Sequence, residues 1–134
     1  MIVRMAELDI VPAQLHAYKL LLEEEIETSI RVEPGVLTLY AVSLKGHPEQ
    51  IRLFEIYRNA ASYESHLQSP HFKVYKAQTQ RMVKGLRLIE TEPILQARNR
   101  DEPAEATRTP QVCLLPYREY LSGNHDGAHR IRPT

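Results

Sequence analysis

The chain has 134 residues, of which 43% are hydrophobic and 25% charged, as in ordinary soluble globular domains. Seventeen Lys and Arg residues balance 17 Asp and Glu residues, so the net charge gives no reason to expect nucleic acid or an anionic membrane as a partner. No apolar run approaches the roughly 20 residues that span a bilayer, and the N-terminus lacks the apolar core of a secretory signal. The single cysteine, Cys113, cannot form an internal disulfide, so a cytoplasmic protein is expected.

The first third of the chain predicts a strand followed by a helix. Residues 2–10 ("IVRMAELDI") alternate in character as a strand does, and Pro12 fits the first turn of a helix running to about residue 31. The apolar stripe of this helix consists of Leu15, Tyr18, Leu22, Ile26 and Ile30. Four glutamates are expected mostly on its other side: Glu23, Glu24, Glu25 and Glu27. The helix should stop at "EPG" (33–35), because proline disfavours helix at Glu33 and glycine permits a turn.

A hairpin is predicted next. Residues 36–44 ("VLTLYAVSL") and 51–58 ("IRLFEIYR") are rich in β-branched and aromatic residues, and "KGHPEQ" (45–50) separates them as a loop. Both strands carry large apolar residues on both faces. A sheet that is apolar on both sides needs a second cover, and a second copy of the chain is the simplest one. The sequence therefore predicts a homodimer.

Two helices and a last strand follow. Asn59 can cap a short helix over 60–68, and Ser69 with Pro70 can begin a second helix that ends at Gly85. Residues 86–94 ("LRLIETEPI") form the final strand. The order predicts an α+β, ferredoxin-like split βαβ fold with a four-stranded antiparallel sheet over residues 1–95. The polar, proline-containing residues 96–134 are expected to form a C-terminal extension, partly a flexible arm.

Three segments resemble one known family: "EPGVLTLYAV", "RLFEIYRNAASYESHLQSPHFKVY" and "LRLIETEPI". Together they are similar to the antibiotic biosynthesis monooxygenase domain family, over roughly residues 1–95. That family includes small quinol monooxygenases and an isomerase that processes autoinducer-2. The resemblance implies a dimeric α/β barrel, a pocket between each sheet and its helices, and no cofactor in the monooxygenases. The extension from residue 96 departs from the short family pattern.

Two histidines and one glutamate are the candidate catalytic residues. His66 lies three residues after Tyr63 on one helix, so both can face the pocket, and imidazole is suited to general base catalysis. The alternative is a helix-end histidine bonded to a backbone carbonyl. His71, in the first turn of the next helix, either faces the pocket or packs at the joint. Glu55 is expected to act as a base or to orient a histidine, unless it pairs with a hydroxyl or with Arg4, Arg52 or Arg87.

Aromatic residues can hold a planar substrate, and those considered are Tyr40, Tyr57, Tyr63, Phe72 and Tyr75. No metal site is expected, because His66 and His71 lie across a helix break without a third ligand, and His125 and His129 flank a glycine in the tail. A cofactor-independent monooxygenase acting on a small aromatic quinol is therefore the leading hypothesis. A proton-transfer isomerase, which a phosphate-holding arginine would favour, and a dimeric binder without catalysis remain open.

Overall fold

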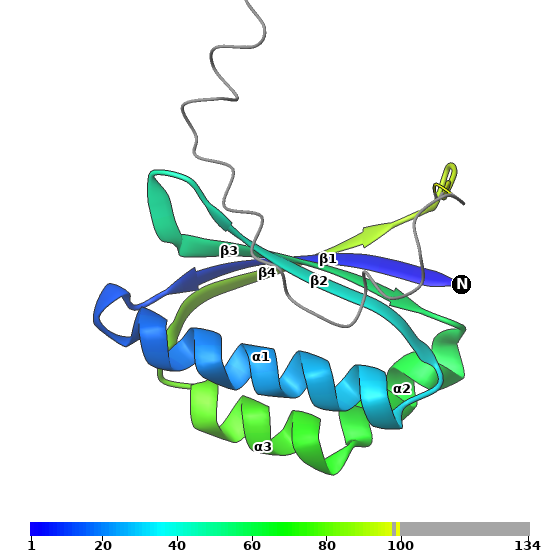
Figure 1. Cartoon of the computed structure of the whole chain (residues 1–134), viewed down its shortest axis with the longest axis horizontal. Coiled ribbons are helices and arrows are strands. Elements are labelled where there is room, and N and C mark those ends of the chain that lie inside the picture. The colour runs from blue at the N-terminus through cyan, green and yellow to red at the C-terminus, as the bar shows by residue number, and fades with distance from the viewer. Residues whose placement is uncertain (98, 100–134) are drawn as a thin grey trace, which may run out of the picture. The chain divides into compact units, whose positions relative to one another are not determined.

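The computed structural model describes residues 1–97 and 99, and in this part all the helices lie on one face of an antiparallel sheet (Figure 1). The elements in chain order are β1 (Ile2–Ile10), a 3₁₀ turn η1 (Pro12–Gln14), α1 (Leu15–Val32), β2 (Val36–Leu44), β3 (His47–Tyr57), α2 (Ala60–Gln68), α3 (Pro70–Thr79) and β4 (Val83–Thr91). The four strands follow the order β2-β3-β1-β4, and every neighbouring pair is antiparallel. This confirms the predicted α+β, ferredoxin-like fold.

Strand register determines which side chains meet the helices. Ala6 of β1 lies opposite Leu53 of β3 and Leu88 of β4, so these three share the face that α1 and α3 cover. The buried core cluster consists of Ala6, Leu8, Ile10, Tyr18, Leu22 and Ile51. Residues 1–96 form one compact unit. None of the helices in the described ranges is long and apolar enough to cross a membrane.

The β2–β3 hairpin is tighter than predicted. Only Lys45 and Gly46 separate the strands, and Leu44 pairs directly with His47. Gly46 has a φ of 83°, a left-handed conformation that glycine adopts without steric cost. The expected loop over 45–50 is therefore wrong, because one glycine is enough to reverse the chain.

Helix α3 is shorter than predicted. It ends at Thr79 instead of Gly85. At this end, the Thr79 hydroxyl donates to the Tyr75 carbonyl at 2.8 Å, and the Met82 N–H donates to the Thr79 carbonyl at 2.9 Å. Gly85 instead belongs to β4, opposite Asp9 and next to a shift in strand register. Residues 80–82 form a turn that leads directly into β4.

The predicted helix caps are confirmed, and they set the joint between α2 and α3. The Asn59 carboxamide accepts the Ser62 N–H at 2.8 Å and so begins α2. The Ser69 hydroxyl accepts the Phe72 N–H at 3.4 Å and donates to the His66 carbonyl at 2.7 Å. Ser69 thus closes one helix and opens the next.

The buried stripe of α1 differs from the predicted one. Tyr18 and Leu22 are buried as expected, but the stripe continues through Glu25 and Ser29, whereas Ile30 is 47% exposed. The Ser29 hydroxyl donates to Glu25 Oε1 at 2.7 Å. A polar pair therefore occupies the end of this helix face, over the region where α2 and α3 meet.

The sheet face turned away from the helices keeps large apolar side chains exposed. Tyr40 of β2 pairs with Phe54 of β3, and these side chains are 66% and 37% exposed. Val42 on the same face is 40% exposed. The expectation of apolar residues on both sheet faces is thus met by the described part of the chain.

Candidate functional site

A cavity of about 600 Å³ lies between the helix-facing side of the sheet and the helices, a size typical of small-molecule sites. Its apolar wall includes Ala6, Leu22, Leu39, Leu53, Leu67, Leu86 and Leu88. Its aromatic wall comprises Tyr57, Tyr63, Phe72 and Tyr75. Acidic and basic side chains also line this space: Glu25, Glu55, His66, Lys76 and Lys84. The cavity is therefore a largely apolar slot with a few polar groups.

His66 is buried at 3% exposure and yet forms part of the cavity wall. Its ring packs against Phe72, with centroids 4.7 Å apart, and against Tyr57 at 5.4 Å. Its Nδ1 lies 2.8 Å from Glu33 Oε2, within hydrogen-bonding distance. Its Nε2 lies 3.7 Å from Glu25 Oε1, which is too long for a hydrogen bond. The ring is thus fixed on one side by a carboxylate, and its other nitrogen is directed toward the side where Glu25 lines the cavity.

Glu33 connects the two histidines. The oxygen that contacts His66 also lies 2.7 Å from His71 Nε2, and His71 Nε2 is 3.2 Å from the Ser69 hydroxyl. Partial burial acts to raise the pKa of Glu33, but the hydrogen bonds and charges of both histidines outweigh it and hold this pKa below its ordinary value. Glu33 is therefore an ionised carboxylate that accepts from two imidazole rings.

His71 lies behind the cavity rather than on its wall. It is not among the lining residues, and its ring centroid is 6.2 Å from that of His66. Of the two histidine candidates, the structure brings only His66 to the cavity. His71 supports it from α3 through their shared carboxylate.

Glu55 meets a hydroxyl, one of the alternatives considered. The Tyr57 hydroxyl donates to Glu55 Oε2 at 3.2 Å on the cavity wall. Burial raises the pKa of Glu55, and the Tyr57 hydrogen bond and nearby positive charge offset only part of this effect. Burial also raises the pKa of Tyr57, so its hydroxyl keeps its proton at neutral pH.

Of the arginines considered as partners of Glu55, Arg4 lies directly opposite it in strand register and its charge acts to lower the pKa of Glu55, whereas Arg52 and Arg87 have other contacts. Arg52 and Arg87 each lie within 4 Å of Glu7, on the opposite sheet face. Arg4 pairs with Glu90 at 3.7 Å, and its guanidinium lies 4.5 Å from the centre of the Tyr63 ring. Within residues 1–97 and 99 the cavity lining contains no arginine, although Lys76 and Lys84 are among its residues.

The predicted aromatic residues separate into two groups. Tyr57, Tyr63, Phe72 and Tyr75 line the cavity, and the Tyr75 hydroxyl is 2.6 Å from that of buried Tyr18. Tyr40 does not share this site. Its neighbour Leu39 faces the cavity, so strand alternation places Tyr40 on the opposite face.

Sequence reasoning missed two residues of the site, Glu25 and Glu33. Glu25 lies seven residues after Tyr18, about two helical turns, and this spacing could have placed it on the buried face. Glu33 was considered only as the end of a helix, and no local pattern indicates that its carboxylate reaches two histidines. Glu25, His66 and His71 are also residue types that bind metal ions, and Glu25 supplies the third side chain that the sequence did not indicate.

Comparisons with known proteins agree with this fold. The antibiotic biosynthesis monooxygenase family matches residues 1–78. A crystal structure from Bacteroides thetaiotaomicron, provisionally described as an antibiotic biosynthesis monooxygenase, is 45% identical, with a TM-score of 0.71 over 73% of this chain and 93% of that chain. A comparison with curated proteins gave no match.

Two further structures are more distant. A provisionally described monooxygenase from Lactobacillus acidophilus is 25% identical, with a TM-score of 0.64, over 65% of this chain and 41% of that one. A protein from Nitrosomonas europaea is 18% identical, with a TM-score of 0.67, over 71% of this chain and 100% of that one, and shows the shared fold. The family match and the 45% identical structure support a monooxygenase-like function. The chain therefore belongs to the antibiotic biosynthesis monooxygenase family.

Proposed function

We propose that the protein is a cofactor-independent monooxygenase that oxidises a small aromatic quinol in the cavity between its sheet and its helices. The observation that carries the proposal is the position of His66: it lines an apolar cavity, while its Nδ1 is held by the ionised Glu33. A histidine fixed in this way presents Nε2 as the proton acceptor. The family membership supports the reaction class, and the apolar and aromatic walls support the substrate class.

The substrate itself can supply the electrons for this reaction. Removal of a phenolic proton gives an electron-rich anion, which transfers one electron to O₂; the two radicals then combine to form a carbon–oxygen bond. Cleavage of the resulting peroxide leaves one oxygen atom on the ring and releases the other as water. A hydroquinone and O₂ thus give a hydroxyquinone and water. The quinol provides all four electrons, and no external reductant is needed.

The side chains around the cavity match these steps. His66 Nε2 takes the phenolic proton, and the imidazolium that forms lies between the carboxylates of Glu33 at 2.8 Å and Glu25 at 3.7 Å, which stabilise its charge. His66 then returns the proton to the departing oxygen. His71 acts as a positioning residue through Glu33, and Glu55 with Tyr57 offers a polar contact to the substrate on the same wall.

Oxygen consumption tests the proposal. Purified protein without flavin and with a chelator present should consume O₂ above the autoxidation rate with one or more members of a hydroquinone panel. With ¹⁸O₂, one labelled atom should enter the product. The H66A variant should lose at least about 100-fold in rate, as expected for a general base. The matched control is H16A, which removes an exposed histidine on α1 and should leave the rate unchanged.

Background rates for the wild type across the panel would reject the monooxygenase. A rate in H66A equal to that of the wild type would reject His66 as the base. Circular dichroism of each variant shows whether a lost rate reflects unfolding instead.

The assembly is also part of the proposal. A homodimer in which a second copy covers the exposed apolar face around Tyr40, Val42 and Phe54 would bury these side chains. The cavity lies on the other face of the sheet, so such a partner would leave it in place. Sedimentation equilibrium of the full chain should give twice the monomer mass, and a monomer at micromolar concentration would contradict this assembly.

A further inference from the structure

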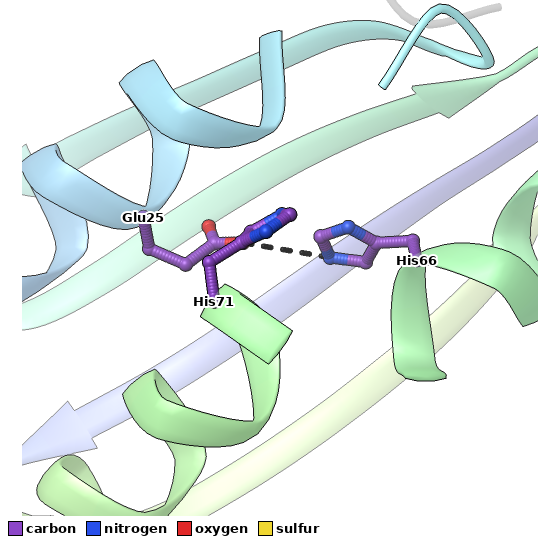
Figure 2. Close-up of side chains that lie close together, drawn as sticks. All are labelled: Glu25, His66 and His71. Carbon is purple, nitrogen blue, oxygen red and sulfur yellow. Dashed lines mark ion pairs between the residues drawn. The ribbon is translucent and has the colours of Figure 1, made fainter. Parts of the chain in front are cut away.

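Three potential metal ligands converge from three different helices. Figure 2 shows Glu25 on α1, His66 on α2 and His71 on α3, with their side chains directed toward a common point. One ligand atom from each residue lies within 4.8 Å of the other two. Two imidazoles and a carboxylate form a ligand set suited to zinc and neighbouring transition metals. These residues are far apart in sequence, so the fold itself brings the set together.

The groups behind these ligands already hold them in place. Glu33 contacts His66 Nδ1 at 2.8 Å and His71 Nε2 at 2.7 Å, and the Ser29 hydroxyl donates to Glu25 Oε1 at 2.7 Å. In protein metal sites, the second nitrogen of a ligating histidine is usually bonded to a carboxylate or a carbonyl, which fixes the ring and its tautomer. With His66 Nε2 and His71 Nδ1 as the ligand atoms, Glu33 would hold the second nitrogen of each ring.

The charges also favour a cation. Glu25 is buried at 6% exposure and pairs with His66, whereas the half-buried Glu33 pairs with both His66 and His71. Both carboxylates thus have imidazole rings as their ion-pair partners. Burying charge in this way is costly unless it is neutralised. A divalent ion would supply the missing charge in one step.

We propose that Glu25, His66 and His71 bind one divalent transition-metal ion of the zinc type, with Glu33 as the carboxylate that orients both rings. Two ligands of a tetrahedral zinc ion lie about 3.4 Å apart when the bonds are about 2.1 Å long. The 3.7 Å between His66 Nε2 and Glu25 Oε1 is close to this spacing, and the widest separation of 4.8 Å must close by rotation of the side chains. Because Glu25 and His66 line the cavity, the fourth coordination position would open toward it.

Metal binding at this cluster does not rest on the proposed monooxygenase function. A metal on His66 Nε2 would occupy the lone pair that the proposed base uses, so the metal-bound protein and the active base exclude each other. Binding is therefore measured directly and apart from oxygen consumption. Failure of one proposal then leaves the other to be judged by its own experiment.

The test uses the full chain, without a histidine tag, after removal of metals with a chelator. Isothermal titration with Zn²⁺ should give one ion per chain, and Co²⁺ should give the visible absorption of a tetrahedral site. E25Q and H71A should each weaken Zn²⁺ binding at least about tenfold, and E33Q should weaken it about 10- to 100-fold through loss of the orienting carboxylate. The matched controls E24Q and H16A change exposed residues on α1 and should bind as the wild type does.

The tail histidines require a control of their own. The double variant H125A/H129A should keep the binding of the wild type if the ion lies in the cluster. Absence of Zn²⁺ binding to the wild type would overturn the proposal, as would unchanged binding in both E25Q and H71A. Because His71 is less buried than Glu25, H71A should keep the fold and decide the test if E25Q unfolds.

Discussion

Replacement of Glu33 by glutamine removes a charge from the centre of the site while keeping the size of the side chain. Glu33 accepts from His66 at 2.8 Å and from His71 at 2.7 Å, and the three side chains are only 13%, 4% and 18% exposed. A hydrogen bond to a charged group contributes about 1.5–3 kcal/mol to stability. The glutamine oxygen can still accept from the rings, but it carries no charge, so both hydrogen bonds lose their charge-assisted part. We expect E33Q to lower the free energy of unfolding by about 2 kcal/mol, or about 10 °C in Tm.

Urea unfolding at neutral pH, followed by circular dichroism, measures this difference. The control E24Q changes an exposed carboxylate on α1 and should stay within about 0.5 kcal/mol of the wild type. H71A should cost less in the E33Q background than in the wild type, because the partner of His71 then carries no charge. A loss for E33Q as small as that of E24Q would refute the reasoning, since the shared carboxylate would then contribute nothing measurable.

Two further predictions concern the turn before β2 and the cavity wall. In G35A, the added Cβ would lie 2.5 Å from the Cβ of Ser62, so about 1–3 kcal/mol of stability should be lost in urea unfolding. Adding S62G to G35A should recover most of this loss. Full stability of G35A alone would contradict this contact. Burial raises the folded-state pKa of Glu55, so the wild type should lose stability as the pH rises from 4.5 through that raised value. In E55Q, the glutamine side chain can still accept from the Tyr57 hydroxyl but carries no charge. The urea midpoint of E55Q relative to that of the wild type should therefore rise over this pH range. A difference between the two midpoints that does not change with pH would exclude a buried, ionising Glu55.

The sequence predicted the fold well because its local signals agree with the tertiary structure. Alternation located β1, side-chain caps at Asn59 and Ser69 located the starts of α2 and α3, and the element order defined the topology. The errors occurred where local signals were weak: one left-handed glycine replaced a six-residue loop, and helix α3 ended early at Thr79.

The site was predicted only in part, for a physical reason. His66 was selected from its residue type and helix position, and the structure places it on the cavity wall. Glu33 is 33 residues away in sequence, and its contact with His66 exists only when α1 and α2 pack against the same sheet. Glu25 was placed with the exposed glutamates because a carboxylate is rarely buried without a partner, and one of its partners, His66, comes from a distant part of the chain.

The joint at Ser69 also restricts how the length of this chain can vary. His66 and His71 belong to different helices, and both reach one oxygen of Glu33 because the connection between α2 and α3 has its present length. One inserted residue at the start of α3 would turn its following side chains by about 100° around the helix axis and direct His71 away from that oxygen. The Lys45–Gly46 hairpin turn holds neither of the histidines that contact Glu33. Insertions and deletions should therefore be tolerated at the hairpin but not between His66 and His71.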